Sequence, residues 1–450
     1  MKALTKIATV LAVLSPSFTF AEYRERAITV FPDQSSIEAG TYPISKVIED
    51  GKALFRARFT PFDGAGRPFA TGDSKPTPRL KPGPSFQRIA GPDASSCEGC
   101  HNQPLLGGSG DFAANVFVGA QFSDPPVDMI KSKVTNERNT TTLFGAGALE
   151  ILASEMTEEL HAKRDAGVEQ AMRNNQPVKV TLETKGVSFG YLVAYPDGHL
   201  DEEMVDGVDY DLVIRPFGAK GITASIREFT VAALNHHHGI QAVERFGWER
   251  TGVKDFDADG YQVEFTIGQV TALSFFQASL QVPNYTDTRR PPAIFEAVGC
   301  GGCHVSKFLL HSGQFQEPNR YNRPGTLRGR DSGRSVSMDI KLPVDGSGNL
   351  YIAPFSDLRR HRMCDETVNF LCNEELRQDN VEQSLFITAK LWNLATSAPY
   401  CHRGDCPTIL QAIKWHGGDA RASRDMFLAL GELDQKELIE YLKTLGGEQE

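Results

Sequence analysis

Cysteine is scarce in this chain, with 8 residues among 450, and tryptophan is scarcer, with 3. Repeated use of so few cysteines in one pattern is therefore poorly explained by chance. After the N-terminal segment no stretch approaches the roughly 18 consecutive apolar residues of a transmembrane helix, so we expect no membrane span. Basic residues are not in excess: the formal net charge is −10, which argues against nucleic acid as a partner.

The pattern that does recur is Cys-x-x-Cys-His, at 97–101 and again at 300–304. Two thiols on one helical turn can each add to a haem vinyl group, and the next histidine then lies under the iron. A zinc site or a redox dithiol would also use paired cysteines, but the following histidine would be incidental. The predicted haem c residues are Cys97, Cys100 and His101 for the first haem and Cys300, Cys303 and His304 for the second.

The N-terminus predicts export. Lys2 and Lys6 flank a short apolar run, and a small-x-small site ends at Ala21, as in a cleavable signal peptide. We therefore expect residues 1–21 to be removed and the mature protein to work in the bacterial periplasm, where c-type haem is attached.

Four cysteines remain once both motifs are served: Cys364, Cys372, Cys401 and Cys406. In an oxidising compartment the simplest disulfides are the two short-loop pairs, 364 with 372 and 401 with 406. The sequence alone does not fix this connectivity, and free thiols are the alternative.

Periodicity predicts a mainly α fold. Helical patterns cover 148–174 and 222–243, and β-branched alternation between them predicts a small antiparallel β insertion at about 177–217. The double proline at 291–292 marks a boundary. We expect two cytochrome c-like haem domains, an N-terminal one at 22–290 that carries the insertion and a C-terminal one at 291–450.

Three stretches carry a resemblance to a known family: "LFGAGALEILASEM", "YIAPFSDLRRHRM" and "FITAKLWNLATSAPYCHRGDCPTILQAIKWHGGDA". They resemble the di-haem oxidoreductase family, also called thiol oxidoreductases, of the bacterial di-haem cytochrome c peroxidase superfamily. The similarity runs from about residue 45 to 445.

This resemblance implies the distal ligand of the second haem. The family's A-P-Y-x-H-x-G segment places its histidine at His402, and the ligand follows fourteen residues later at His416. The resemblance thus implies two imidazoles, from His304 and His416, on the second iron, and a role for His402 near a haem propionate. Arg403 stands where the family usually has aspartate, which leaves the hydrogen bonding there in doubt.

At the first haem the distal side is less defined. Relatives carry a distal histidine soon after the motif, but residues 102–160 contain none. The sixth position is then either open or filled from the triplet His236–His238. Glu150 and Glu155 are the candidate proton donors by resemblance, and at most one can serve, because they lie about 140° apart on a helix. We choose Glu150 as the catalytic acid.

An acidic loop at 255–264 is similar to the front half of a calcium-binding EF-hand loop. The glutamate expected at position twelve is absent, and Glu264 at position ten is the substitute. An acidic turn without metal is the alternative. The candidate calcium ligands are Asp255, Asp257, Asp259 and Glu264.

Together these features predict a periplasmic di-haem oxidoreductase that reduces hydrogen peroxide at the first haem with electrons relayed by the second. A small redox protein would serve as electron partner, and hydrogen peroxide or another small oxidant as substrate. Two alternatives remain: oxidative modification of a partner protein or organic substrate, and a plain electron-transfer cytochrome. Iron coordination separates them, because an enzyme needs a position that oxygen or peroxide can reach.

Overall fold

The computed structural model of the protein describes residues 25–66, 94–111, 113–116, 136–256, 260–283, 291–329 and 335–446. The expected signal peptide, 1–21, lies outside these ranges. Within them, every helix is too short or too polar to span a membrane.

The first part of the chain is built on a close pair of helices, α2 (Ile44–Arg56) and α8 (Ile267–Ala278). Gly51 permits their approach, because a Cβ there would lie 2.0 Å from the Ala272 carbonyl oxygen. The two helices bury their apolar faces in one core. Shorter helices surround the pair: α1 (Gln34–Glu38), η1 (Pro61–Asp63), α5 (Ile226–Ala233), the π-helix η3 (Leu234–His238), α6 (Val243–Phe246) and α7 (Trp248–Thr251).

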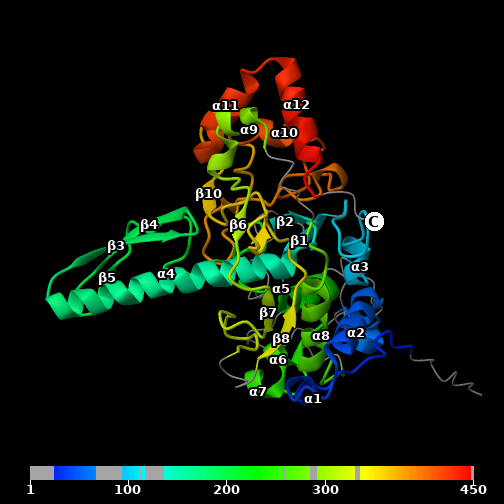
Figure 1. Cartoon of the computed structure of the whole chain (residues 1–450). Helices are drawn as coiled ribbons and strands as arrows, with labels where there is room; N and C mark the ends of the chain where they lie inside the picture. The colour runs from blue at the N-terminus through cyan, green and yellow to red at the C-terminus, as the bar shows by residue number, and fades with distance from the viewer. Residues whose placement is uncertain are drawn as a thin grey trace, which may run out of the picture.

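A long helix, α4 (Ala146–Asn174), leaves the body of the molecule (Figure 1). Its first half is buried, with Met156 and Leu160 fully covered, whereas its second half extends outward beside an antiparallel sheet in the order β3-β4-β5. Alternate residues of β3 are buried, as a sheet with one packed face requires. The strands are β3 (Val178–Thr184), β4 (Val187–Ala194) and β5 (Leu200–Asp201).

The C-terminal helices gather at the opposite end of the body from α2 and α8 (Figure 1). Aromatic side chains of Phe295, Phe355 and Phe427 fill the core between them. The elements are α9 (Ala293–Ala297), η4 (Cys300–Gly302), η5 (Leu394–Thr396), α10 (Ile409–Lys414), η6 (Gly418–Ala420), α11 (Arg421–Leu428) and α12 (Glu432–Lys443).

The prediction of a mainly α fold is wrong, because 35% of the described residues are helical and 15% are in strands. Among the described residues, four two-stranded antiparallel sheets accompany the sheet β3-β4-β5. Their strands are two to four residues long, too short to show the alternation that identifies a strand in a sequence. They pair β1 (Ala113–Val116) with β2 (Asn136–Asn139), β6 (Phe308–Leu309) with β9 (Tyr351–Ile352), β7 (Gln314–Glu317) with β8 (Val336–Asp339), and β10 (Arg360–Arg362) with β11 (Leu385–Ile387).

Packing joins the two sides of residue 290. One hydrophobic core contains Ala278 and Val282 from the N-terminal side and Phe308, Phe315 and Trp392 from the C-terminal side. The two parts of the chain therefore hold each other in place.

The disulfide prediction is confirmed. Cys364 is bonded to Cys372, and Cys401 to Cys406. The four cysteines of the two Cys-x-x-Cys-His motifs form no disulfide among the described residues.

Candidate functional site

The first motif forms a single helical turn, α3 (Cys97–Cys100). Ser96 begins the turn, and its side-chain oxygen accepts a hydrogen bond from the Gly99 amide at 3.1 Å. Residues three apart on a helix are neighbours, so the turn brings the thiols of Cys97 and Cys100 to one side. His101 follows directly and is half-buried.

The imidazole of His101 is fixed through one nitrogen. Its Nδ1 lies 3.2 Å from the Gly108 carbonyl oxygen, and because a carbonyl only accepts, Nδ1 carries the proton and Nε2 keeps its lone pair. The loop reaches back because position 108 is glycine: a Cβ there would lie 1.9 Å from the Gln103 carbonyl oxygen. Burial lowers the pKa of His101 to about 4, so the ring is neutral at pH 7, as metal binding requires.

The histidine triplet lies beside this first motif, on the π-helix η3, a type of helix that is frequent at functional sites. His238 is occupied, because its Nδ1 donates to the Ala94 carbonyl at 2.7 Å and its Nε2 lies 3.8 Å from Cys97 Sγ. His237 is close enough to His101 to lower the pKa of that imidazole. His237 and His238 thus both lie near the first motif.

The second motif has the same arrangement. Cys300 is the first residue of the short helix η4, and Cys303 follows its last residue. The Nδ1 of His304 donates to the Phe355 carbonyl at 2.8 Å. Burial lowers the pKa of His304 to about 4, and the neighbouring His416 lowers it as well. His304 thus presents a neutral Nε2, and the structure brings His416 to the same site.

His416 lies just after α10, and its Nδ1 donates to the Ala412 carbonyl at 2.7 Å. Burial lowers the pKa of this imidazole too. Because Nδ1 donates to the Ala412 carbonyl, Nε2 is the nitrogen that could bind a metal. Two glycines, Gly417 and Gly418, follow His416. A Cβ at these positions would lie 2.5 Å from the Val368 carbonyl oxygen and 2.1 Å from that of Arg362, so the glycines permit close packing against 362–368.

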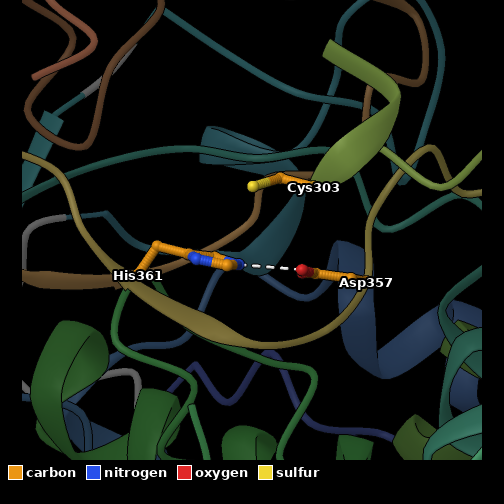
Figure 2. A group of neighbouring side chains, drawn as sticks. All are labelled: Cys303, Asp357 and His361. Atoms are coloured by element: carbon orange, nitrogen blue, oxygen red, sulfur yellow. Dashed lines mark hydrogen bonds and ion pairs between the residues drawn. The ribbon is translucent and has the colours of Figure 1, made fainter. Parts of the chain in front are cut away.

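A buried carboxylate and imidazole lie next to the second motif (Figure 2). His361 Nε2 is 2.8 Å from Asp357 Oδ2, and both side chains converge on Cys303. Burial opposes the charge on His361, but its contacts with Asp357 and Cys303 outweigh burial and raise its pKa to about 10. The sequence analysis missed this pair, although both residues stand in one of the family-like stretches.

His402 lies in a buried polar cluster. Its Nε2 is 3.3 Å from Glu374 Oε1, but Arg138 at 2.5 Å and Lys220 at 3.1 Å already balance that carboxylate. Burial lowers the pKa of His402 to about 2, and both cations act in the same direction. The imidazole is neutral, and its role near a haem propionate stays a prediction.

Glu150 and Glu155 point to different partners, as their helical separation requires. Glu150 is buried and accepts hydrogen bonds from the Ile226 amide and Asn319 Nδ2, both at 2.8 Å. Burial raises its pKa to about 8, so it holds a proton at neutral pH. Glu155 instead pairs with Lys185 at 2.7 Å. In the part of the chain that is described, no contact joins either glutamate to His101.

The candidate calcium ligands are only partly described, because Asp257 and Asp259 lie outside the described residues. Asp255 accepts a hydrogen bond from the Gly260 amide at 2.9 Å. Glu264 is buried, and its Oε2 accepts from the Gln241 amide at 2.6 Å. One oxygen of Glu264 thus already has a partner, and the calcium site stays a prediction.

The segment 388–396 joins the surroundings of both motifs. At one end the Leu391 amide donates to the Pro354 carbonyl, next to the residue that holds His304. At the other, Ser109 Oγ donates to the Thr396 carbonyl at 3.4 Å, next to the residue that holds His101. Trp392 is buried between these ends.

The residues of each motif fit a haem. Each site has two cysteines that are not disulfide-bonded and one neutral imidazole whose Nδ1 is fixed by a backbone carbonyl. A dithiol site would not need a hydrogen bond that fixes the histidine, whereas metal-ligating histidines almost always have one on their other ring nitrogen.

Residues 334–445 match a protein family described as "Di-haem oxidoreductase, putative peroxidase". The match confirms the expected resemblance over these residues, which contain His402 and His416 but neither Cys-x-x-Cys-His motif. The description of that family names haem and oxidoreductase activity.

One solved structure that resembles the chain is hydrazine synthase from Kuenenia stuttgartiensis, pressurised with 20 bar xenon. It is 13% identical, and the alignment covers 98% of this chain and 100% of that chain, with a TM-score of 0.33. This likeness is too weak to support a conclusion about the fold. No curated protein matches the chain.

Proposed function

We propose that the protein is a periplasmic di-haem c-type oxidoreductase that reduces hydrogen peroxide at the first haem, with electrons supplied through the second. The proposal rests on one observation: each Cys-x-x-Cys-His motif presents two cysteines that are not disulfide-bonded, followed by a neutral histidine fixed through Nδ1. Covalently bound haem would supply one-electron chemistry and an iron position for an oxygen ligand.

The residues give the two sites different roles. At the second site, His304 and His416 are both neutral and fixed through Nδ1, which suits an electron relay with two strong ligands. At the first site, His101 is the proximal ligand, and His237 and Lys390 are its ionisable neighbours. A small redox protein would deliver electrons, and the net charge of −10 favours a basic one.

Glu150 is the proposed proton donor. Its pKa of about 8 suits an acid that must hold a proton until it is needed. Its hydrogen bonds to Ile226 and Asn319 also give it a structural role, so a variant at this position must be tested for rate and for stability.

A plain electron carrier is the second candidate, and the position of His237 favours it. If His237 ligates the first iron, both irons have six strong ligands and peroxide finds no free position.

Three measurements on the intact protein test these proposals. The denatured mass should exceed that of the mature chain by roughly 1.2 kDa, the mass of two haems. Electron paramagnetic resonance of the oxidised protein should show one low-spin and one high-spin haem, and stoichiometric peroxide should change the spectrum of the high-spin haem. A mass without haem would refute the whole proposal, whereas two low-spin haems inert to peroxide would establish the carrier.

A further inference from the structure

The loop 354–361 supports the second motif and has an unusual backbone. Its Phe355 carbonyl accepts the hydrogen bond from His304 Nδ1 at 2.8 Å. Two of its residues, Phe355 and Leu358, have φ angles of +52° and +59°, in the left-handed region that favours glycine. Residues with side chains stay in this region only where surrounding contacts hold them there, and such positions are concentrated at functional sites. The conformation of this loop is therefore a reason to look for a function in the side chains that it holds.

Asp357 is the residue that holds the loop together. Its side chain is 2% exposed, and Oδ1 accepts hydrogen bonds from the Arg359 amide at 3.0 Å and from the Thr388 hydroxyl at 2.7 Å. The other oxygen, Oδ2, lies 2.8 Å from His361 Nε2. Both carboxylate oxygens are thus engaged, and Asp357 fixes the position of the His361 ring.

The imidazole of His361 lies between two carboxylates. Nε2 faces the buried Asp357, and Nδ1 lies 3.8 Å from Oδ2 of Asp419, whose side chain is 55% exposed. A ring nitrogen that faces a carboxylate keeps its proton, because the carboxylate only accepts, and an imidazole with two protons is positively charged. Burial opposes this charge, but contacts with Asp357 and Cys303 raise the pKa of His361 to about 10. His361 is therefore a buried imidazolium.

This ion pair lies against a haem-binding cysteine (Figure 2). Cys303 Sγ, a His361 ring nitrogen and an Asp357 oxygen all lie within 4.8 Å of one another. The first motif differs, because the histidine next to Cys97 is His238, whose Nδ1 donates to a backbone carbonyl and not to a carboxylate. A carbonyl fixes an imidazole, whereas a carboxylate also stabilises a positive charge on it. The structure thus places a charged pair at the second motif and a differently held imidazole at the first.

A charge beside a haem changes how readily that haem accepts an electron. Reduction adds one negative charge, so a neighbouring cation favours it and a neighbouring anion opposes it, most strongly where burial excludes water. We propose that Asp357 and His361 form a charged pair that sets the redox potential of the second haem at its Cys303 attachment, with Asp357 as the positioning residue. The inference rests on the proposed function only in that a haem occupies the motif at 300–304. The pair would keep the relay haem reducible by its protein donor.

The test is a spectroscopic redox titration of both haems in the haem-loaded full-length protein. It compares the wild type with His361→Gln and with the double variant His361→Gln/Asp357→Asn. The first haem of the same molecule is the internal reference, and His199→Gln is the matched control, because His199 is exposed in the turn between β4 and β5. Haem content and thermal melting show that each variant folds, and electron paramagnetic resonance shows whether the second haem stays low-spin.

His361→Gln leaves the Asp357 carboxylate buried without its counter-charge. At a fixed potential, the ratio of reduced to oxidised second haem should fall about 10-fold, equal to about 59 mV for a one-electron couple. The double variant also removes the carboxylate and should recover most of this loss, whereas damage to the loop would not be repaired by a second substitution. The potential of the first haem should stay at its wild-type value in both variants.

Three results would overturn the inference. The first is an unchanged second-haem potential in folded His361→Gln, and the second is a double variant whose potential stays as low as that of the single variant. The third is loss of a low-spin signal in His361→Gln, which would make His361 an iron ligand. If neither variant folds, Asp419→Asn removes an exposed carboxylate beside the imidazolium and should raise the second-haem potential; no rise would then overturn the inference.

Failure of this inference can be told apart from failure of the proposed function. A wild-type protein that is inert to peroxide, but whose second-haem potential depends on His361 as described, would refute peroxide reduction and support the charged pair. A protein that reacts with peroxide, but whose potentials are the same with histidine or glutamine at 361, would refute the charged pair and leave the proposed function intact.

Discussion

At the scale of single residues, the second iron site depends on His416, whose Nδ1 is held by Ala412. His416→Ala should convert one low-spin haem to high spin and shift its potential, because a strong imidazole ligand is lost. Electron paramagnetic resonance measures the spin state, and a redox titration measures the potential. His199→Ala is the control, because His199 is exposed in the turn between β4 and β5. An unchanged spectrum would move the ligand elsewhere, with His361 or His402 as the next candidates.

Glu150 gives a prediction about pH. Its pKa rises from 4.5 to about 8 on folding, so between these values the folded protein holds a proton that the unfolded chain has released. The free energy of unfolding should therefore fall as pH rises through this window, by up to about 1.4 kcal/mol per pH unit from this group. Denaturant titrations across the window should show this slope in the wild type and its loss in Glu150→Gln.

Glu155→Gln is the matched control for Glu150→Gln, because Glu155 sits on the same helix and pairs with Lys185. A role in proton transfer adds a second expectation: Glu150→Gln should slow the peroxide reaction about 10²- to 10⁴-fold with both haems retained. A changed slope with an unchanged rate would make Glu150 a structural residue only.

Some site residues could be predicted from the sequence and others could not. The Cys-x-x-Cys-His motifs are local in sequence, so the pattern itself states the chemistry. Asp357 and His361 were missed as a pair, since only the fold turns them toward Cys303.

At the scale of elements, the acidic loop 255–264 carries the calcium prediction. A metal that binds only the folded protein stabilises it by about 2.7 kcal/mol at a concentration of 100 times its dissociation constant. Chelation should then lower the melting temperature by roughly 2–4 °C per kcal/mol, and Asp257→Ala should remove the effect. Asp197→Asn, in the turn between β4 and β5, is the control. A melting curve indifferent to both chelator and Asp257→Ala would leave an acidic turn without metal.

Elements differ in how well a sequence predicts them. Strands β3 and β4, beside α4, are seven and eight residues long, so the alternation of apolar and polar residues along them is visible in the sequence. The pairs β6-β9 and β10-β11 have two or three residues per strand, and their partners lie far apart in the chain. Such pairings are set by tertiary contacts, which no local pattern records.

At the scale of the whole molecule, the 388–396 segment contacts the surroundings of both motifs. Trp392 is 3% exposed, its Nε1 donates to the Ala353 carbonyl at 2.6 Å, and its ring packs against Gly145. Ala353 precedes the residues that hold His304, and Gly145 begins the helix after the loop whose Thr141 backbone contacts His101. No local pattern in the sequence predicts this position of Trp392, because it follows from tertiary contacts alone.

We predict that Trp392 carries electrons between the two sites. Trp392→Phe removes the indole and its hydrogen bond but keeps an aromatic ring of smaller size, so electron transfer from the second haem to the first should slow while both potentials stay near their wild-type values. Flash reduction followed at wavelengths that separate the two haems measures this rate.

Trp415→Phe is the control, because Trp415 is exposed and stacks on Phe370 rather than between the sites. Since Trp392 is buried, loss of its hydrogen bond should also cost about 1–3 kcal/mol of stability, so thermal melting must show that the variant is folded when the rate is measured. An unchanged transfer rate in folded Trp392→Phe would mean that electrons pass directly between the haem edges, and the segment would then serve only to hold the two halves together.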